Sequence, residues 1–160
     1  MKSGGMDVEK GPLKCLFVSS EVAPYAKTGG FCNRLFVLFI FAFCLLDSHA
    51  SGAYNQNGNF YGFHIHEGGS CTGDATDPFK DAGGHYNPTN QEHPFHAGDM
   101  PVIMGNQGAA WFQFYTNRFY PEEIVGKTVV VHDMPDDFRS QPSGDSGVKI
   151  ACGRIREYEE

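Results

Sequence analysis

Alternation of apolar and polar side chains predicts a series of β-strands in the C-terminal two-thirds of this 160-residue chain. Residues 60–66 follow the period-two pattern of a strand, which places His64 and His66 on the same face. Runs of β-branched and aromatic residues predict further strands at 102–104, 109–115, 128–132 and 148–153. Twenty glycines and nine prolines in turn-like clusters also favour β structure over long helices. We therefore expect an all-β domain over residues 59–160.

Two long loops rich in Gly, Pro and Asp, 67–101 and 133–147, separate the predicted strands. Loops of that length in a compact domain are usually functional, or are held by something other than secondary structure. The formal net charge of −7 argues against nucleic acid, which requires basic surfaces, and against passive binding to anionic membranes. An anionic substrate would have to be attracted by a local positive patch rather than by the overall charge.

The N-terminal residues 1–30 carry a different pattern. An apolar run, a turn and Lys-Thr-Gly-Gly at 27–30 suggest a buried strand that leads to an anion-binding loop. Residues 13–30 resemble the N-terminus of bacterial glycogen (starch) synthases, in which the Lys-x-Gly-Gly turn contacts the nucleotide-sugar phosphate. The resemblance stops at Gly30, and a nucleotide-sugar glycosyltransferase needs two large domains that this chain cannot contain. We interpret this segment as a borrowed or mis-joined leader.

Residues 31–58 comprise an apolar segment and a polar linker. The unbroken apolar run at 35–46 is shorter than the ~20 residues of a membrane span and fits the ~7–15 residues of a signal-peptide core. Arg34 precedes it, and residues 48–50 have the small-x-small pattern of a cleavage site. If 34–50 act as a signal, the protein is exported to the periplasm or beyond; otherwise it is cytoplasmic, and a retained 35–46 would be a membrane anchor. The alternatives are a buried core strand or helix, or translated sequence of no design.

Six of the seven histidines lie in the predicted β domain with one well-spaced aspartate, and imidazole is the commonest side-chain ligand for zinc and copper. Histidines two apart on a strand have backbones about 6.5–7 Å apart, which suits two ligands of one ion. Three imidazoles and a carboxylate at 85–99 would complete a closed tetrahedral zinc shell. Each motif taken alone has an alternative interpretation. His64 and His66 could be surface histidines, 85–99 could be a polar loop rich in histidine, and His132 could be a core or edge histidine. The set that predicts two ions is His64, His66, His85, His93, His96, Asp99 and His132.

The order of these motifs, together with residues 62–67 and 151–153, resembles Cu/Zn superoxide dismutase over about 59–155. The resemblance implies copper at His64, His66, His85 and His132. It implies zinc at His85, His93, His96 and Asp99, with His85 as the bridging imidazolate. Four nitrogens in a tetragonal arrangement also suit Cu(II).

Further roles follow from the same resemblance. It implies that Asp136 links the two metal sites and that Cys71 and Cys152 form an intrasubunit disulfide. Lys149 stands where the family has an arginine, keeping the positive charge and losing the planar fork, so that catalysis should be slower. His85 and Lys149 are thus the expected catalytic residues, and Lys80 and Arg139 could add local positive charge. The remaining cysteines, Cys15, Cys32 and Cys44, are expected to be free thiols.

The expected function is disproportionation of superoxide to O2 and hydrogen peroxide. The alternatives are a non-catalytic copper/zinc-binding protein and a truncated or fused product without stable activity. The implied fold is an eight-stranded Greek-key β-sandwich, or barrel, whose first three strands have no counterpart in this sequence. That deletion would expose an inner face containing Phe63, Ile65, Val129 and Val131, unless residues 35–46 or another subunit cover it. Exposed apolar surface of this kind would favour self-association, for instance as a homodimer.

Overall fold

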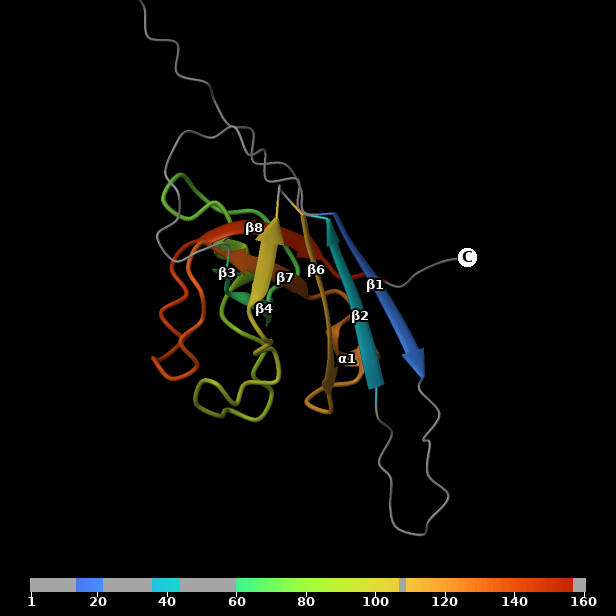
Figure 1. The fold of residues 1–160 in the computed structure, drawn as a ribbon. Helices are drawn as coiled ribbons and strands as arrows, with labels where there is room; N and C mark the ends of the chain where they lie inside the picture. Colours follow the sequence, from blue (N-terminus) through green and yellow to red (C-terminus); the bar gives the residue numbers. More distant parts are fainter. Residues whose placement is uncertain (1–13, 22–35, 44–59, 107–108, 157–160) are drawn as a thin grey trace, which may run out of the picture.

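Two antiparallel β-sheets make up the architecture (Figure 1). The structure is a computed structural model and describes residues 14–21, 36–43, 60–106 and 109–156. The strands are β1 (Lys14–Glu21), β2 (Phe36–Phe43), β3 (Phe60–Tyr61), β4 (Phe63–His66), β5 (Ile103–Asn106), β6 (Ala109–Thr116), β7 (Thr128–His132) and β8 (Lys149–Arg154). One 3-10 turn, η1 (Lys80–Ala82), and one short helix, α1 (Pro121–Ile124), complete the elements of the described ranges. The all-β prediction is confirmed.

The larger sheet has the strand order β1-β2-β6-β5-β3. Its β1 and β2 form an antiparallel pair, and β2 also pairs with β6 from Phe36↔Thr116 to Ala42↔Ala110. The continuous apolar and aromatic sequence of β2 suits a strand with a neighbour on each edge. Residues 36–43 of the apolar run therefore form a strand within the sheet. No described helix is both long and apolar enough to span a bilayer.

The smaller sheet, with the order β4-β7-β8, carries the histidines on one face and the core on the other. Its strands pair with Phe63 opposite Val131 and Ile65 opposite Val129. Because side chains alternate along a strand, these four residues share one face while His64 and His66 occupy the opposite face. The same alternation therefore builds both the core and the metal-ligand face.

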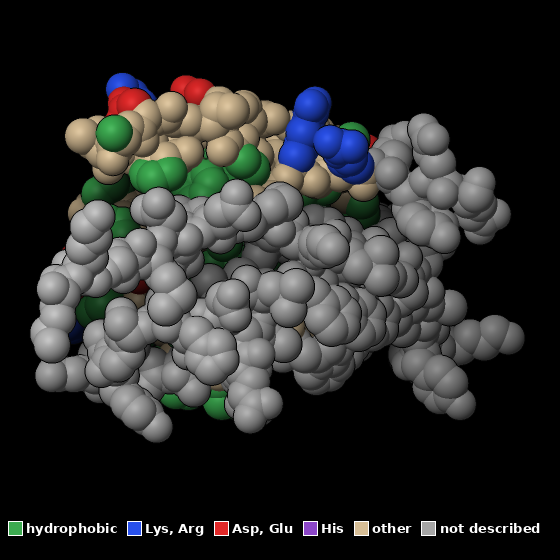
Figure 2. All heavy atoms as spheres, turned by 90° about the horizontal axis from the view of Figure 1, so that it is seen from above, with side chains coloured by type: hydrophobic (Ala, Val, Ile, Leu, Met, Phe, Trp, Pro, Cys, Tyr) green, Lys and Arg blue, Asp and Glu red, His purple; other side chains and the backbone are tan. Residues whose placement is uncertain are grey.

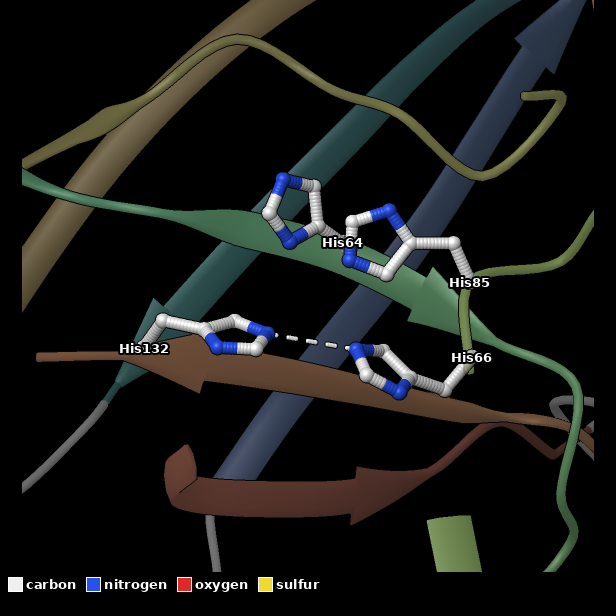
Figure 3. A group of neighbouring side chains, drawn as sticks. All are labelled: His64, His66, His85 and His132. Atoms are coloured by element: carbon white, nitrogen blue, oxygen red, sulfur yellow. Dashed lines mark hydrogen bonds between the residues drawn. The ribbon is translucent and has the colours of Figure 1, made fainter. Parts of the chain in front are cut away.

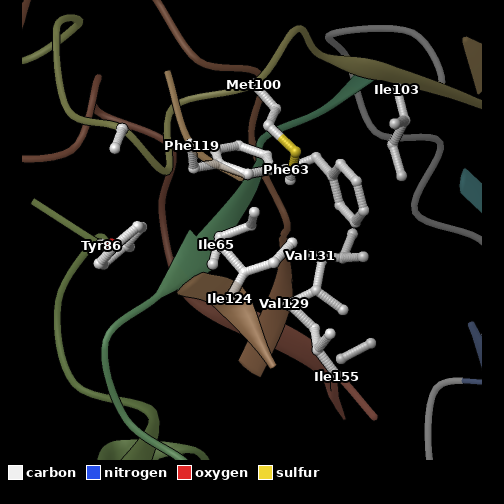
Figure 4. Close-up of a cluster of buried hydrophobic side chains, with 12 residues drawn as sticks. Phe63, Ile65, Tyr86, Met100, Ile103, Phe119, Ile124, Val129, Val131 and Ile155 are labelled. Atoms are coloured by element: carbon white, nitrogen blue, oxygen red, sulfur yellow. The ribbon is translucent and has the colours of Figure 1, made fainter. Parts of the chain in front are cut away.

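The hydrophobic core lies between the two sheets (Figure 4). Phe63 and Ile65 are fully buried, and Phe63 meets Phe112 of β6 edge to face with ring centroids 5.5 Å apart. Phe112 stacks in turn on Phe114, with centroids at 5.2 Å. A fully buried side chain of this size stabilises the folded state by about 1.5–3 kcal/mol. The inner face that the sequence analysis identified as in need of cover is therefore packed against β6.

Parts of the sequence interpretation lie outside the described residues. These are the Lys-Thr-Gly-Gly turn at 27–30, the cleavage-site pattern at 48–50 and the predicted linker at 47–58. The division into leader, apolar segment and β domain remains a prediction, as does the absence of three strands of the family fold. Within the described part, β1 and β2 come from residues that precede the predicted β domain.

Candidate metal centre

Strand β4 provides the first two ligand candidates. His64 and His66 lie on its outer face, with ring centroids 6.4 Å apart, and are respectively 0% and 2% exposed. The two-residue spacing therefore has the predicted effect, since both rings project to one side. The alternative of a pair of surface histidines is wrong, because both rings are buried.

The loop after β4 returns along the strand's second edge and brings two more ligand candidates with it. The amide of Ile65 donates to Gly98 O at 2.9 Å, and Ile65 O accepts from the amide of Tyr86 at 2.8 Å. These contacts form isolated bridges that set His85 beside His66 and Asp99 beside His64. A side chain at Gly98 would collide with Ile65 O, so only glycine permits this close approach.

Strand β7 ends at His132, which completes a group of four histidines (Figure 3). His64, His66, His85 and His132 each offer one nitrogen, and the four nitrogens lie within 4.8 Å of one another. Three strand positions and one loop position thus converge on one point, as the sequence analysis expected for the copper ligands.

The tautomers in this group leave ring nitrogens without protons where they face one another. His66 Nδ1 donates to Gly83 O at 2.8 Å and His132 Nδ1 donates to Gly147 O at 3.3 Å, because a carbonyl oxygen only accepts. Their Nε2 atoms lie 3.2 Å apart. Burial lowers the pKa of His66 to about 2 and that of His132 to about 3, so neither ring carries a second proton at neutral pH. Two facing lone pairs at this distance call for a shared cation.

The second group contains His85, His93, His96 and Asp99, whose ligand atoms also lie within 4.8 Å of one another. Asp99 Oδ1 lies 2.7 Å from His85 Nδ1 and 3.3 Å from His96 Nδ1, and its Oδ2 lies 3.0 Å from His93 Nδ1. Burial would raise the pKa of Asp99, but the hydrogen bond from His85 and the charges of the three histidines lower it to about 2. Asp99 is therefore an ionised carboxylate at the centre of three imidazoles.

Asp136 joins the two groups through their outer nitrogens. Its Oδ2 accepts from His64 Nε2 at 2.7 Å, and its Oδ1 accepts from His93 Nε2 at 2.9 Å. Burial opposes ionisation of this carboxyl, but the hydrogen bond from His64 and further donors lower its pKa. The position matches the linking role expected of Asp136. Such carboxylates fix the tautomer and orientation of metal-ligating histidines.

Buried nitrogens without partners show that both groups fit metal ions. Among the described side chains, His64 Nδ1, His85 Nε2 and His93 Nδ1 are buried and accept no hydrogen bond. His93 Nδ1 faces Asp99 without a bond, because its proton is on the Nε2 that faces Asp136. A buried polar atom left unpaired costs about 1–3 kcal/mol, which a bound cation would recover. Four nitrogens suit copper, and three nitrogens with one carboxylate suit zinc.

The predicted disulfide is present between Cys71 and Cys152, 81 residues apart. It joins the loop after β4 to strand β8. Cys71 and Phe79 pack against a small apolar cluster formed by Ala82, Val130 and Cys152 on the outer face of the smaller sheet. The disulfide therefore holds the loop that carries His85 against the strands that carry the other ligands.

The cations proposed to attract an anion are all paired with aspartates. Lys149 Nζ donates to Asp77 Oδ2 at 2.7 Å, Lys80 Nζ lies 3.1 Å from Asp74 Oδ2, and Arg139 Nε lies 3.7 Å from Asp137 Oδ2. On the face shown in Figure 2, basic and acidic side chains occur in small groups. Lys149 lines the same cavity as His66, His85 and His132. It lies where a steering residue is needed, but it already has an anionic partner.

Two residues of the site carry no signal in the sequence. Gln141 bridges the two long loops, since its Oε1 accepts from His93 N at 3.0 Å and its Nε2 donates to His93 O at 2.7 Å. Arg118, just after β6, donates through Nη1 to Pro94 O at 3.0 Å and to His96 O and Asp99 O at 3.2 Å. Both residues act through backbone carbonyls and amides, which no motif spacing reveals.

Replacing Arg118 should loosen the second ligand group. In Arg118→Met the three carbonyls lose their shared donor, and we expect zinc affinity to fall about tenfold, in the range found for outer contacts of metal ligands. Competition with a chromophoric chelator measures this loss. Arg118→Lys, which keeps a positively charged nitrogen as donor, should recover part of the affinity, and Arg154→Met is a control of equal charge change. Unchanged zinc affinity in Arg118→Met would remove any role for this contact.

Comparison with known proteins agrees with this geometry. Residues 46–155 match the family model described as copper/zinc superoxide dismutase (SODC). The chain is 35% identical over 127 residues to superoxide dismutase-like protein YojM of Bacillus subtilis, covering 69% of this chain and 62% of that protein. It is 37% identical over 111 residues to superoxide dismutase [Cu-Zn] of Deinococcus radiodurans, covering 58% of this chain and 61% of that protein. The chain thus spans about three fifths of the length of these relatives.

Solved structures show the same fold. Cu/Zn superoxide dismutase from Brucella abortus superposes with a TM-score of 0.55 and 25% identity, over 89% of this chain and 99% of that one. A SOD-like protein from Bacillus subtilis superposes with a TM-score of 0.52 and 29% identity, over 73% and 79% of the two chains. The predicted fold class is confirmed, and the matched residues include both ligand groups and the disulfide. This chain belongs to the copper/zinc superoxide dismutase family, whose metals are copper and zinc.

Proposed function

We propose that this protein is a superoxide dismutase, which converts two superoxide anions and two protons into one molecule of O2 and one of hydrogen peroxide. The observation that carries the proposal is the pair of ligand groups that share His85. One group offers four nitrogens and the other offers three nitrogens and a carboxylate. A single metal site would need neither the shared histidine nor the Asp136 link.

We assign copper to the group of four histidines and zinc to the group that contains Asp99. Copper would supply a one-electron redox couple, and zinc would supply a fixed positive charge. The protein's part is to hold the ligands in fixed tautomers. Gly83 O and Gly147 O hold the protons of His66 and His132 on Nδ1, and Asp136 holds that of His64 on Nε2. The ring nitrogens of His64, His66 and His132 that face the first site are therefore free of a proton.

His85 can hold a proton at one defined atom. Asp99 keeps its Nδ1 turned toward the second ligand group at 2.7 Å, and its Nε2 has no protein partner. Nε2 is therefore the atom from which a proton can be passed to a reduced oxygen species. This supports the catalytic role expected of His85.

A cavity of about 550 Å³ opens beside His85 and the rest of the first ligand group. Its lining includes His66, His85 and His132, with Lys149 beside them. The opening would admit a small anion to the first ligand group, while the second group is buried under the loop. Superoxide, with two atoms, is such a small anion.

Turnover of superoxide by the chain loaded with copper and zinc tests the proposal. We expect dismutation well above that of free copper and sensitive to cyanide. His85→Ala should lower the dismutation rate to that of free copper or below, because both ligand groups lose a ligand. His49→Ala changes the one histidine outside the ligand groups and should keep the rate of the unaltered protein. Stoichiometric metal binding without dismutation would contradict the proposal.

A non-catalytic copper/zinc-binding protein is the second candidate, and one observation favours it. The ion pair between Lys149 and Asp77 removes the net positive charge that would attract superoxide. The same assay separates the two candidates, since metal binding alone would leave cyanide without effect. A third candidate, a truncated or fused product without stable structure, predicts no cooperative melting and no increase of the melting temperature with zinc.

We propose export as the fate of the protein if residues 34–50 act as a signal, and a cytoplasmic location otherwise. The disulfide supports an oxidising compartment, because such bonds are rare in the reducing cytosol. Self-association as a homodimer remains a proposal, with eight large apolar side chains exposed among the described residues, Phe95 and Val148 the most at 66% each. Sedimentation of the purified protein would test it.

A further inference from the structure

The cavity at the first ligand group contains one ion pair. Among the described residues that line it, Lys149 and Asp77 are the two with a full charge. Lys149 begins strand β8 and lies opposite His132 in the β7–β8 register. Its ammonium therefore lies at the entrance to the site rather than on the outer surface.

The ammonium of Lys149 is held by two acceptors. Its Nζ donates to Asp77 Oδ2 at 2.7 Å and to Phe79 O at 3.2 Å, and its side chain is 15% exposed. Asp77 is itself fixed, because its Oδ1 accepts from the amide of Phe79 at 3.1 Å while its backbone O accepts from the amides of Asp74 and Lys80. The turn at 74–80 thus aims a carboxylate at the ammonium.

A carboxylate in that position competes with any other anion for the same ammonium. An ammonium has three donor hydrogens, and two of them already have acceptors here. An arriving monoanion must displace Asp77 or share Lys149 with it. Lys80 and Arg139 do not compensate, since each has its own aspartate and neither lines the cavity.

We propose that Asp77 is a specificity-determining residue, which acts as an internal counter-anion to Lys149 and weakens the binding of small anions in the cavity. The proposal rests on the proposed function in one respect, that an anion is the molecule admitted. It extends that function by assigning opposite effects to two residues of one ion pair. Removing the carboxylate should improve anion binding, and removing the ammonium should weaken it.

Azide binding to the protein loaded with copper and zinc tests this, followed through the absorption of the copper site. In Asp77→Asn we expect azide to bind about threefold to tenfold more tightly at low ionic strength. The change is of this size because the interaction between partly exposed charges alters a binding constant by little more than that factor. The gain should shrink at 0.15 M salt, where screening acts over about 8 Å. Lys149→Ala should weaken azide binding by a similar factor, and the double variant should lie between the two.

Asp145→Asn is the matched control, because it removes one negative charge from an exposed residue that does not line the cavity. Its azide affinity should equal that of the unaltered protein. The 15N signal of the Lys149 ammonium gives a readout that needs no copper. Azide should shift this signal at lower concentration in Asp77→Asn than in the unaltered protein.

The opposite result would show that Asp77 positions Lys149 for anions instead of competing with them. Weaker or unchanged azide binding in Asp77→Asn, together with an unchanged ammonium signal, overturns the proposal. The proposed function fails separately, through absent dismutation. A protein that does not dismutate superoxide but shows the opposite effects of the two variants on azide would still have Asp77 in the inferred role.

Discussion

Asp136→Asn is expected to weaken both metal sites at once while leaving the hydrophobic core unchanged. The substitution keeps the size of the side chain and removes the negative charge. One carboxylate oxygen that accepts a hydrogen bond becomes an amide NH2, which then faces an imidazole N–H. Either His64 or His93 loses its acceptor, at a cost of about 1–3 kcal/mol for a buried donor.

Metal affinity should fall about 10–100-fold, as is typical when an outer partner of a metal-ligating histidine is removed. The freed ring can turn or take the other tautomer, which places a proton on the nitrogen meant for the metal. Space for such a change is small on one side, because even a Cβ added at Gly144 would collide with Asp136 Oδ1 and His93 Nε2. We therefore expect the ligand to lose its orientation rather than the loop to rearrange.

Chelator competition for copper and for zinc, made separately, measures the effect at each site. Asp145→Asn is the control in this experiment as well, since Asn tolerates the positive φ of 48° at that position and the residue is exposed. A loss at one site with none at the other would show that Asp136 serves a single ion. Equal affinity at both sites would remove the linking role altogether.

Removing the disulfide should lower the free energy of unfolding by ~4–5 kcal/mol in the chain-entropy description, given the separation of 81 residues between Cys71 and Cys152. A change of that size is a large part of the stability of a small domain. The loop it closes, residues 71–152, contains every ligand of the two groups except His64 and His66, so its loss frees most of the metal centre in the unfolded chain. Zinc binding should then depend more strongly on temperature.

Urea unfolding of the metal-loaded Cys71→Ala, Cys152→Ala double variant measures this free energy. Cys15→Ala is the control, because Cys15 lies in β1 and has no part in the predicted disulfide. Reduction of the unaltered protein should reproduce most of the loss without changing the small cluster around Val130. A free energy of unfolding within 1 kcal/mol of that of the control, on the order of a surface change, would contradict the entropic argument.

Much of the site could be predicted from sequence because its ligands follow local geometry. The period of a strand fixes that His64 and His66 face one way, and the run before His132 is a strand by composition alone. The positions of His85 and Asp99 could not be predicted from strand geometry. They are fixed by backbone hydrogen bonds between the long loop and Ile65. The family resemblance supplied those assignments.

Long-range partners could not be predicted at all. Asp77 lies 72 residues from Lys149 in sequence, and nothing in the turn at 74–80 identifies which of its aspartates faces the cavity. Arg118 was equally hidden, since its partners are carbonyls that every residue possesses. The apolar run at 35–46 was open to several interpretations because a short apolar segment has no period that separates a strand from a signal core.

The pairing of β2 with β6 has a consequence for how the protein is made. About 70 residues are synthesised between the end of β2 at Phe43 and the end of β6 at Thr116, which takes roughly 4–14 s at ribosomal speed. During that interval β1 is the neighbour that β2 can have, and its second edge is open to other chains. The nascent protein thus exposes an unpaired, apolar and aggregation-prone strand edge for seconds. We therefore expect its yield in cells to depend on chaperones that bind such edges.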